Sequence, residues 1–314
     1  MTPIQGLHHV TAITNDAQKN LDFYTQSLGL RLVKLTVNYD DPQTYHLYYG
    51  DGTGSPGTIM TFFAWPGRRG TAGTGQVTET AFAVPVGAID WWHKRLPGQL
   101  STRFGQRTLL IRDPDDMPLA LLESPGVTER FAWQGGGVPL EHAIRGFHGV
   151  TLTETDARLP ASILAERFGY RASGREGNRV RYESPGEHAR IVDVLTQERL
   201  PARLGPGQVH HVAFRVPTDD EQATWLRQLR TDGLPVSPVM DRDYFHSIYF
   251  REPGGTLFEL ATDGPGMAIN EPVETLGSRL MLPAWLEEQR AAIEAGLPPL
   301  TLPAPAQPVP AESI

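Results

Sequence analysis

The chain has 314 residues with 39% hydrophobic and 20% charged residues, ordinary values for a soluble globular protein of about two domains. Its formal net charge of −8 argues against a nucleic-acid partner, which would favour a basic surface. The sequence has no cysteine, so any metal must be bound through nitrogen and oxygen. No stretch is apolar enough for a membrane span and no secretory signal is evident, so we expect no membrane partner and a cytoplasmic location.

Internal repeats divide the chain into four similar modules. GLHHVT (6–11) aligns with GFHGVT (146–151), and GQVTETAFAVP (75–85) aligns without a gap with GQVHHVAFRVP (207–217). RDPDDMPLALLE (112–123) aligns in the same way with REPGGTLFELAT (251–262). These alignments define modules at 6–66, 75–125, 144–198 and 207–263.

Each module begins with a short β-type run and continues with a stretch whose apolar residues recur at helical spacing. Further β-type runs separated by turn residues follow. The helical stretches lie at 20–30, 88–96, 161–170 and 221–230. This βαβββ order lacks the strict alternation of a doubly wound sheet and predicts the α+β class.

The modules fall into two sequential halves and a tail. We expect an N-terminal half over 1–137, which holds the first two modules, and a C-terminal half over 138–266, which holds the last two. The segment 267–314 predicts a helix at 283–295, with Pro283 in its first turn and Gly296 just past its end. The Pro-rich stretch that follows is expected to be extended, and either packed on the body or partly disordered.

Two imidazoles and one carboxylate stand out when the modules are compared. His9, His211 and Glu259 lie in modules 1 and 4, and modules 2 and 3 do not reproduce the set. Their counterparts are Gly149, Glu79 and Ala120. Two histidines and a carboxylate form the facial triad that holds non-haem iron(II) with open coordination positions. The three residues can meet only if modules 1 and 4 share one curved sheet, which leaves modules 2 and 3 to form the other.

Each candidate histidine belongs to a pair, and one member of each pair is favoured. His211 is favoured over His210 because it lies on the more polar face of its strand. Alternation does not decide between His8 and His9, but the repeat does, because His148 matches His8 in a module that lacks the triad. His9 is therefore the expected ligand. The other two histidines are expected beside the ligands or in the core.

The opening segment GLHHVTAITNDAQKNLDFYTQSLGLRLV resembles that of the vicinal oxygen chelate (glyoxalase/bleomycin resistance/extradiol dioxygenase) superfamily. From about residue 5 to 265 the chain resembles the hydroquinone-type ring-cleaving dioxygenases of that superfamily. The segments that carry this are YHLYYGDGTGSPGTIMTFF, TRFGQR, PLEHAIRGFHGVT, EGNRVRY and DRDYFHSIYFREPGGTLFELAT. The resemblance implies two open barrels, with modules 1 and 4 paired around a metal and modules 2 and 3 paired in a metal-free barrel.

The resemblance also implies a chemistry. It places the ligands of an Fe(II) ion at His9, His211 and Glu259, although the triad suits Mn(II) as well. The reactants would be a small aromatic diol and O2, with extradiol-type cleavage of a hydroquinone or catechol-like ring. The resemblance further implies contacts to ligands or substrate at His8, Thr11, His210, Arg242 and Tyr249.

The roles of these further residues follow from their chemistry. Tyr249 is expected to donate a hydrogen bond to bound oxygen or to act in acid–base catalysis, and Arg242 to hold the second oxygen of the substrate. Thr11 and His46 are weaker candidates, because such residues more often serve as strand polar residues than as catalysts. Strand alternation points His8 and His210 away from the ligand face, so a β-bulge beside the metal would be needed to re-aim them.

Two other functions occur in the same superfamily. A glyoxalase-type isomerase needs a fourth protein ligand, and aligning GTIMT (57–61) with GTLFE (255–259) puts Thr61, a poor ligand, at that position. A non-catalytic small-molecule binder of the same superfamily would need no triad. The sequence leaves open which ring substituents are accepted and also the oligomeric state, with which a homo-oligomer is compatible.

Overall fold

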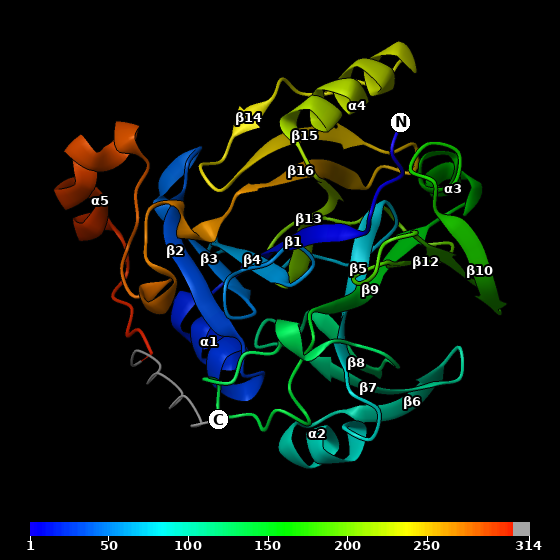
Figure 1. Ribbon diagram of the computed structural model, residues 1–314, viewed down its shortest axis with the longest axis horizontal. Coiled ribbons are helices and arrows are strands. Elements are labelled where there is room, and N and C mark those ends of the chain that lie inside the picture. Colours follow the sequence, from blue (N-terminus) through cyan, green and yellow to red (C-terminus); the bar gives the residue numbers. More distant parts are fainter. Residues whose placement is uncertain (304–314) are drawn as a thin grey trace, which may run out of the picture.

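Two curled sheets of eight strands each organise the protein in the computed structural model, which describes residues 1–303 (Figure 1). The strand order is β14-β15-β16-β13-β1-β4-β3-β2 in the first sheet and β10-β11-β12-β9-β5-β8-β7-β6 in the second. Modules 1 and 4 share the first sheet, and modules 2 and 3 share the second. The predicted α+β class and the predicted non-sequential pairing are both confirmed.

The first sheet joins strands from the two ends of the repeat array. Module 1 supplies β1 (Leu7–Thr14), β2 (Arg31–Asn38), β3 (Asp41–Gly50) and β4 (Ile59–Ala64). Module 4 supplies β13 (Gln208–Val216), β14 (Met240–Asp241), β15 (Phe245–Arg251) and β16 (Leu257–Pro265). The two groups meet where β1 and β13 pair antiparallel, side by side in Figure 1.

The second sheet repeats this arrangement with the two middle modules. Module 2 supplies β5 (Gln76–Val84), β6 (Gln99–Arg103), β7 (Gln106–Arg112) and β8 (Pro118–Glu123). Module 3 supplies β9 (Phe147–Glu154), β10 (Arg171–Glu176), β11 (Arg179–Glu183) and β12 (Ile191–Thr196). The antiparallel pair β5–β9 joins the strands of module 2 to those of module 3. Each sheet thus takes one module from each sequential half, and the division at 137/138 and 266/267 stays a prediction.

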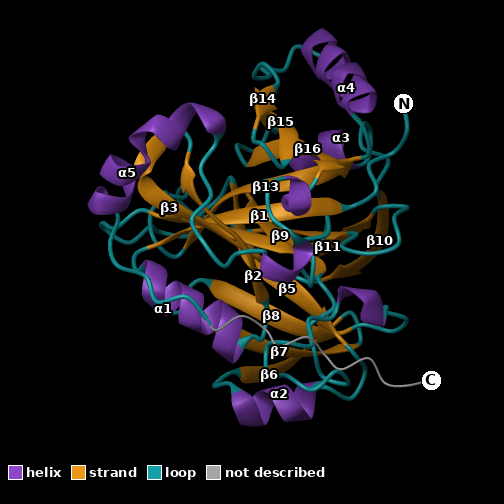
Figure 2. Cartoon of the chain, turned by 60° about the vertical axis from the view of Figure 1, so that its left-hand side comes forward, coloured by secondary structure: helices purple, strands orange, loops and turns teal. Residues whose placement is uncertain are grey.

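Four helices occupy the predicted helical stretches and lie at the periphery of the sheets (Figure 2). They are α1 (Ala17–Asp22), which continues as the π-helix η1 (Phe23–Ser27), α2 (Ile89–Arg95), α3 (Arg158–Leu164) and α4 (Asp219–Thr231). Three of them, α1, α3 and α4, begin two or three residues earlier than predicted. In α1 and α4 a polar side chain caps the first turn. Asp16 accepts hydrogen bonds from the backbone N–H groups of Gln18 and Lys19, and Thr218 accepts one from Glu221. None of the helices in residues 1–303 is long and apolar enough to cross a membrane.

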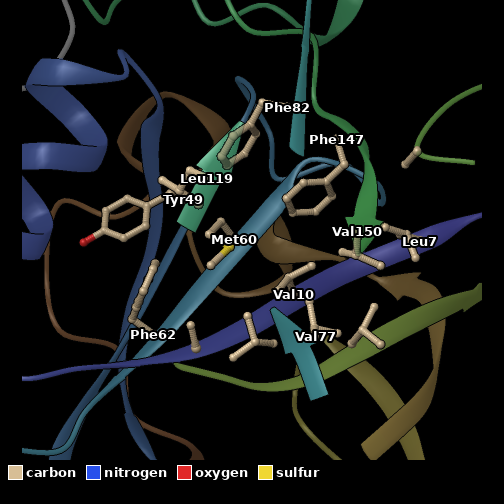
Figure 3. Packing of buried hydrophobic residues seen from close by; sticks show 14 of the residues in the cluster. Leu7, Val10, Tyr49, Met60, Phe62, Val77, Phe82, Leu119, Phe147 and Val150 are labelled. Atoms are coloured by element: carbon tan, nitrogen blue, oxygen red, sulfur yellow. The ribbon is translucent and has the colours of Figure 1, made fainter. Parts of the chain in front are cut away.

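A single hydrophobic cluster lies between the sheets and joins them (Figure 3). Val10 of β1 and Met60 of β4 come from the first sheet, and Val77 of β5 and Val150 of β9 come from the second. All four are at most 3% exposed. Burying each such side chain stabilises the fold by about 1.5–3 kcal/mol. The two sheets are therefore packed into one body.

The C-terminal segment is helical where predicted, with shifted ends. A 3₁₀ turn, η5 (Ala284–Gln289), precedes α5 (Arg290–Gly296). Pro283 is the N-cap residue rather than part of the first turn, and Gly296 is the last helical residue rather than the one after it. Leu300 and Leu302 are partly buried against the core. The remainder of the predicted tail, 304–314, lies outside the described residues.

A buried ion pair holds the segment between β16 and α5 against the first sheet. This segment contains the short turns η3 (Met267–Ile269) and η4 (Val273–Thr275). Lys34 of β2 is fully buried and forms an ion pair with Glu271, which is 1% exposed at its side chain. The ammonium also donates a hydrogen bond of 2.9 Å to Asn270 Oδ1. Burial lowers the pKa of Lys34, and the carboxylate of Glu271 opposes that shift.

Replacing Lys34 by Met should destabilise the protein, because it leaves the Glu271 carboxylate buried without its cation. We expect the free energy of unfolding to fall by about 3–5 kcal/mol, measured by urea denaturation. The matched control, Lys34→Met combined with Glu271→Leu, removes both charges and should recover most of the loss. A single variant that loses less than about 1 kcal/mol would show that the pair does not hold this segment.

Candidate metal centre and substrate pocket

The register of the first sheet brings His9, His211 and Glu259 to one place. Ala213 of β13 stands opposite His9 of β1 on one side and opposite Glu259 of β16 on the other. Its methyl group leaves space between those two longer side chains. His211 lies two residues before Ala213 and so faces the same side of β13. His9 lies 202 residues before His211 in the sequence, yet the strands that carry the three residues are neighbours in the sheet.

Three ligand atoms converge at this place. His9 Nε2 lies 3.3 Å from His211 Nε2 and 3.2 Å from Glu259 Oε2, and His211 Nε2 lies 2.9 Å from Glu259 Oε2. All three residues are buried, and Glu259 Oε2 has no hydrogen bond of acceptable geometry within residues 1–303. Neighbouring ligands around an octahedral ion at about 2.1 Å stand about 3.0 Å apart. The three residues fit a metal ion and could hold one.

The protonation states of these groups also suit a metal. Burial tends to raise the pKa of Glu259, but the two imidazoles outweigh it and keep that pKa well below its usual value. Burial lowers the pKa of His211, which favours the neutral ring. Carboxylate and neutral imidazole are the forms that bind metal ions.

A β-bulge lies at the first histidine of each pair. Between Leu7 and His9 the pairing with β13 moves by one residue, so His8 is the extra residue on β1. Between His211 and Val209 the pairing with β1 moves by one residue, so His210 is the extra residue on β13. Simple strand alternation fails at both places, because a bulge re-aims its residue. Such bulges are what His8 and His210 need in order to turn toward the ligands, but one strand's sequence alone cannot show them.

The bulges bring each extra histidine against its neighbouring ligand. The Nδ1 atoms of His8 and His9 lie 2.9 Å apart, and those of His210 and His211 lie 2.8 Å apart. Burial lowers the pKa of His8 well below its usual value and that of His210 to about 3, so both rings are neutral. A neutral ring can accept a hydrogen bond at Nδ1. A ligand histidine that donates its Nδ1–H in this way presents a bare Nε2 to a metal.

The second sheet keeps the bulges but not the site. Its extra residues are Thr78 on β5 and His148 on β9, at the positions of His210 and His8. Glu79, which replaces His211, forms a two-pronged ion pair with Arg103. The bulges therefore belong to the fold itself, and an ion pair takes the position that His211 has in the first sheet.

Glu259 and the fourth-ligand position are both held by hydroxyl groups. Ser247 of β15 donates a hydrogen bond to Glu259 Oε1, which leaves Oε2 directed at the other two ligand atoms. Thr61 donates to Thr11 Oγ1 at 2.9 Å and lies 2.9 Å from His46 Nε2. Its hydroxyl is thus engaged away from the triad. Sequence reasoning missed Ser247, although it shares a strand face with Tyr249 and could have been considered for that reason.

A pocket of about 310 Å³ opens beside the triad. Much of its wall is aromatic, formed by Tyr39, Tyr48, Phe63, Trp65 and Phe245. The predicted residues Thr11, His210, Arg242 and Tyr249 line it, together with the weaker candidate His46. His8 does not line the pocket and packs behind His9, with its ring centroid 5.0 Å from that of Phe245.

Tyr249 and Arg242 lie together at one side of this pocket. Tyr249 stands opposite Glu259 in the β15–β16 register, and its ring lies 5.6 Å from that of His211. Arg242 Nε lies 3.4 Å from the Tyr249 hydroxyl, and its Nη1 lies 3.4 Å from Asp40 Oδ2. Burial raises the pKa of Tyr249 above its usual value, so the phenol stays protonated at neutral pH.

Known proteins with similar sequences span nearly the whole chain. MhqO of Bacillus subtilis (strain 168), provisionally named a ring-cleaving dioxygenase, is 45% identical over 300 residues, which are 94% of this chain and 96% of MhqO. The chlorohydroquinone/hydroquinone 1,2-dioxygenase of Sphingobium indicum is 36% identical over 301 residues, which are 90% of this chain and 93% of that enzyme.

Solved structures agree with this likeness. The crystal structure of a provisionally named dioxygenase from Bacillus subtilis matches with a TM-score of 0.93 at 43% identity, covering 96% of this chain and 99% of that one. Glyoxalase I from Zea mays has the same fold, with a TM-score of 0.61 at 11% identity, over 82% of this chain and 92% of that one. Residues 6–260 match the family model itself. The chain belongs to the Glyoxalase/Bleomycin resistance protein/Dioxygenase superfamily.

Proposed function

We propose that this chain is a dioxygenase that uses O2 to open the ring of a hydroquinone or catechol-like substrate. The observation that carries the proposal is the set of three buried, convergent donor atoms beside an aromatic pocket. Thr61, at the place of a fourth ligand, has its hydroxyl engaged by Thr11 and His46. A site with three protein ligands keeps coordination positions for substrate and oxygen, whereas a glyoxalase-type isomerase would use four. The names of the two relatives support the same reaction class.

His9, His211 and Glu259 would hold the metal, which we propose to be Fe(II), although the donor set also suits Mn(II). When bound, such an ion supplies open positions for a substrate hydroxyl and for oxygen, and it conducts electrons between them. His8 and His210 would each take a hydrogen bond from the Nδ1–H of the adjacent ligand. This contact fixes the ring orientation and keeps Nε2 free of a proton.

The pocket residues would orient the ring. Phe63 and Trp65 offer flat apolar surfaces, with ring centroids 4.7 Å apart, on which an aromatic substrate can lie. Arg242 would bind the second oxygen of the substrate, since its guanidinium has only long contacts to Tyr249 and Asp40. Tyr249 would donate its hydroxyl proton in a hydrogen bond to an oxygen atom beside the triad. Thr11 Oγ1 would accept a hydrogen bond of 2.9 Å from Thr61 and so keep the Thr61 hydroxyl turned away from the ligand atoms.

The reaction and the triad can be tested together. The protein is reconstituted with Fe(II) without air, and oxygen uptake is then followed with hydroquinone, methylhydroquinone and catechol. His9→Ala, His211→Ala and Glu259→Ala should each lower the bound metal to less than about a tenth of the wild-type content, because the remaining two ligands cannot hold it. His93→Ala, on the exposed side of α2, is the matched control. Isomerisation of a thiohemiacetal without oxygen uptake would overturn the proposal.

Tyr249→Phe tests the hydrogen bond from the phenol. Because the change removes one oxygen and keeps the ring, metal content should stay at the wild-type level. We expect kcat to fall by about 10²-fold, the usual lower range for a lost acid–base group. Tyr182→Phe makes the same change in the second sheet and should leave kcat unaltered. Equal kcat values for the two variants would show that the Tyr249 hydroxyl takes no part in the reaction and that the residue only lines the pocket.

The charge at the pocket wall should select against anionic substrates. Asp41 accepts hydrogen bonds from Thr44 and from the Trp65 indole, which lower its pKa and keep it ionised. Asp40 places a second carboxylate on the same wall, near Arg242. We therefore expect a higher kcat/KM for methylhydroquinone than for gentisate, which carries a carboxylate.

Asp40→Asn should raise the relative kcat/KM for gentisate by about two- to fivefold, the size expected for a solvent-exposed charge. The measurement compares the two substrates in one preparation, so differences in metal loading cancel. Asp220→Asn on α4 is the matched control. If the ratio is the same in both variants, the carboxylate at position 40 plays no part in substrate selection.

A further inference from the structure

A second cavity, of about 400 Å³, lies in the other half of the fold. It forms where β8 ends and β9 begins, beneath the linker that carries the short 3₁₀ turn η2 (Glu129–Phe131). It shares no lining residue with the pocket beside the triad. Nothing in the proposed ring-opening chemistry makes use of it.

Arg145, in the wall of this cavity, carries a buried charge without an anion. The residue is 2% exposed, and its guanidinium donates only to the backbone carbonyls of Ala143 and Leu140. Its Nε has no hydrogen-bond partner, and no carboxylate in residues 1–303 forms an ion pair with it. Burial lowers the pKa of Arg145, and the more distant Glu129 opposes that shift. Buried charges in proteins are normally paired, so the site lacks an anion.

His148 adds a second unused donor to the same cavity. It is the histidine that the second sheet keeps at the bulge although that sheet has no triad. Its Nδ1 lies 3.0 Å from Ser124 Oγ, and its buried Nε2 has no partner in the described part of the chain. Ser124 Oγ can donate either to Nδ1 or, at 3.3 Å, to the backbone carbonyl of Leu122. In the first case the ring proton of His148 is on Nε2, where no group in residues 1–303 accepts it.

The rest of the wall fixes the kind of anion that would fit. The wall also holds three further arginines and two carboxylates, and each of these arginines is paired: Arg181 with Asp193, Arg190 with Glu183 and Arg130 with Glu187. Arg145 is the arginine of this wall, within residues 1–303, that has no carboxylate partner. Apolar side chains, among them Phe147 and Ile191, cover another part of the wall. A guanidinium matches the planar, two-oxygen end of a carboxylate, and apolar walls favour a flat organic remainder. A fully hydrated inorganic ion would leave this apolar wall unused.

We propose that this cavity binds a small organic carboxylate, whose oxygens accept hydrogen bonds from Arg145 and from His148 Nε2. The site is independent of the metal centre and does not rest on the proposed dioxygenase reaction. The ligand would neutralise the buried guanidinium and use both donors that the protein leaves unpaired.

Isothermal titration with benzoate, and separately with inorganic phosphate, tests this site in the full-length chain. Benzoate should bind, and Arg145→Met should weaken its binding by at least about tenfold, since a charge-assisted pair is lost. Arg158→Gln, an exposed arginine on α3, is the matched control and should bind within about twofold of the wild type. Benzoate that occupies the metal centre instead would bind Arg145→Met as well as it binds the wild type, and would contradict the proposal.

A second variant covers the case in which Arg145→Met fails to fold. His148→Leu keeps the apolar volume of the side chain and removes the Nε2 donor, so it should weaken benzoate binding by several-fold. Absence of benzoate binding at 10 mM, or equal binding by His148→Leu and the wild type, would overturn the proposal. Tighter binding of phosphate than of benzoate would contradict an organic carboxylate as the ligand.

Discussion

The buried carboxylate of Glu259 is the constraint on which the first sheet depends. A carboxylate at the centre of a packed sheet is costly unless a cation or hydrogen bonds compensate it. Ser247 donates a hydrogen bond to one oxygen, and the other faces two imidazole nitrogens and has no hydrogen bond from any of the residues that the structure describes. A divalent cation would accept a lone pair from each of the three groups. Without a cation, these lone pairs would face one another at short range. The non-sequential pairing of modules 1 and 4 places the three residues on the neighbouring strands β1, β13 and β16, where their side chains can converge.

Much of the sheet order and of the metal site could be predicted from the sequence, because the four modules of the chain can be compared with one another. The copies that lack His9 and Glu259 set these residues apart from the fold, and the need to join them predicted the sheet order. The bulges at His8 and His210 could not be predicted, since a bulge depends on how two strands pair and not on either strand alone. Ser247 escaped notice for a related reason. Its role appears only once β15 is paired with β16.

The repeat also separates what belongs to the fold from what belongs to the chemistry. Both sheets carry bulges at matching positions, so the irregular seam is a property of the module pair. At the position of His211 the second sheet has Glu79, which pairs with Arg103, whereas Arg242 in the first sheet has only long contacts. Arg103 is the repeat counterpart of Arg242. The proposed role of Arg242 in binding a substrate oxygen needs a guanidinium without such a close partner.

The two sheets end with opposite electrostatic imbalances. Within residues 1–303, Glu259 Oε2 in the first sheet is a buried carboxylate oxygen without a hydrogen bond, and Arg145, just before β9 of the second sheet, is a buried guanidinium without an anion. Arg145 lines a cavity, and Glu259 Oε2 faces His9 and His211, which line the other pocket. The same physical rule that predicts a cation beside Glu259 therefore predicts an anion beside Arg145. A duplicated scaffold that has the triad in one sheet only would in this way carry a second site, for a ligand of the opposite charge.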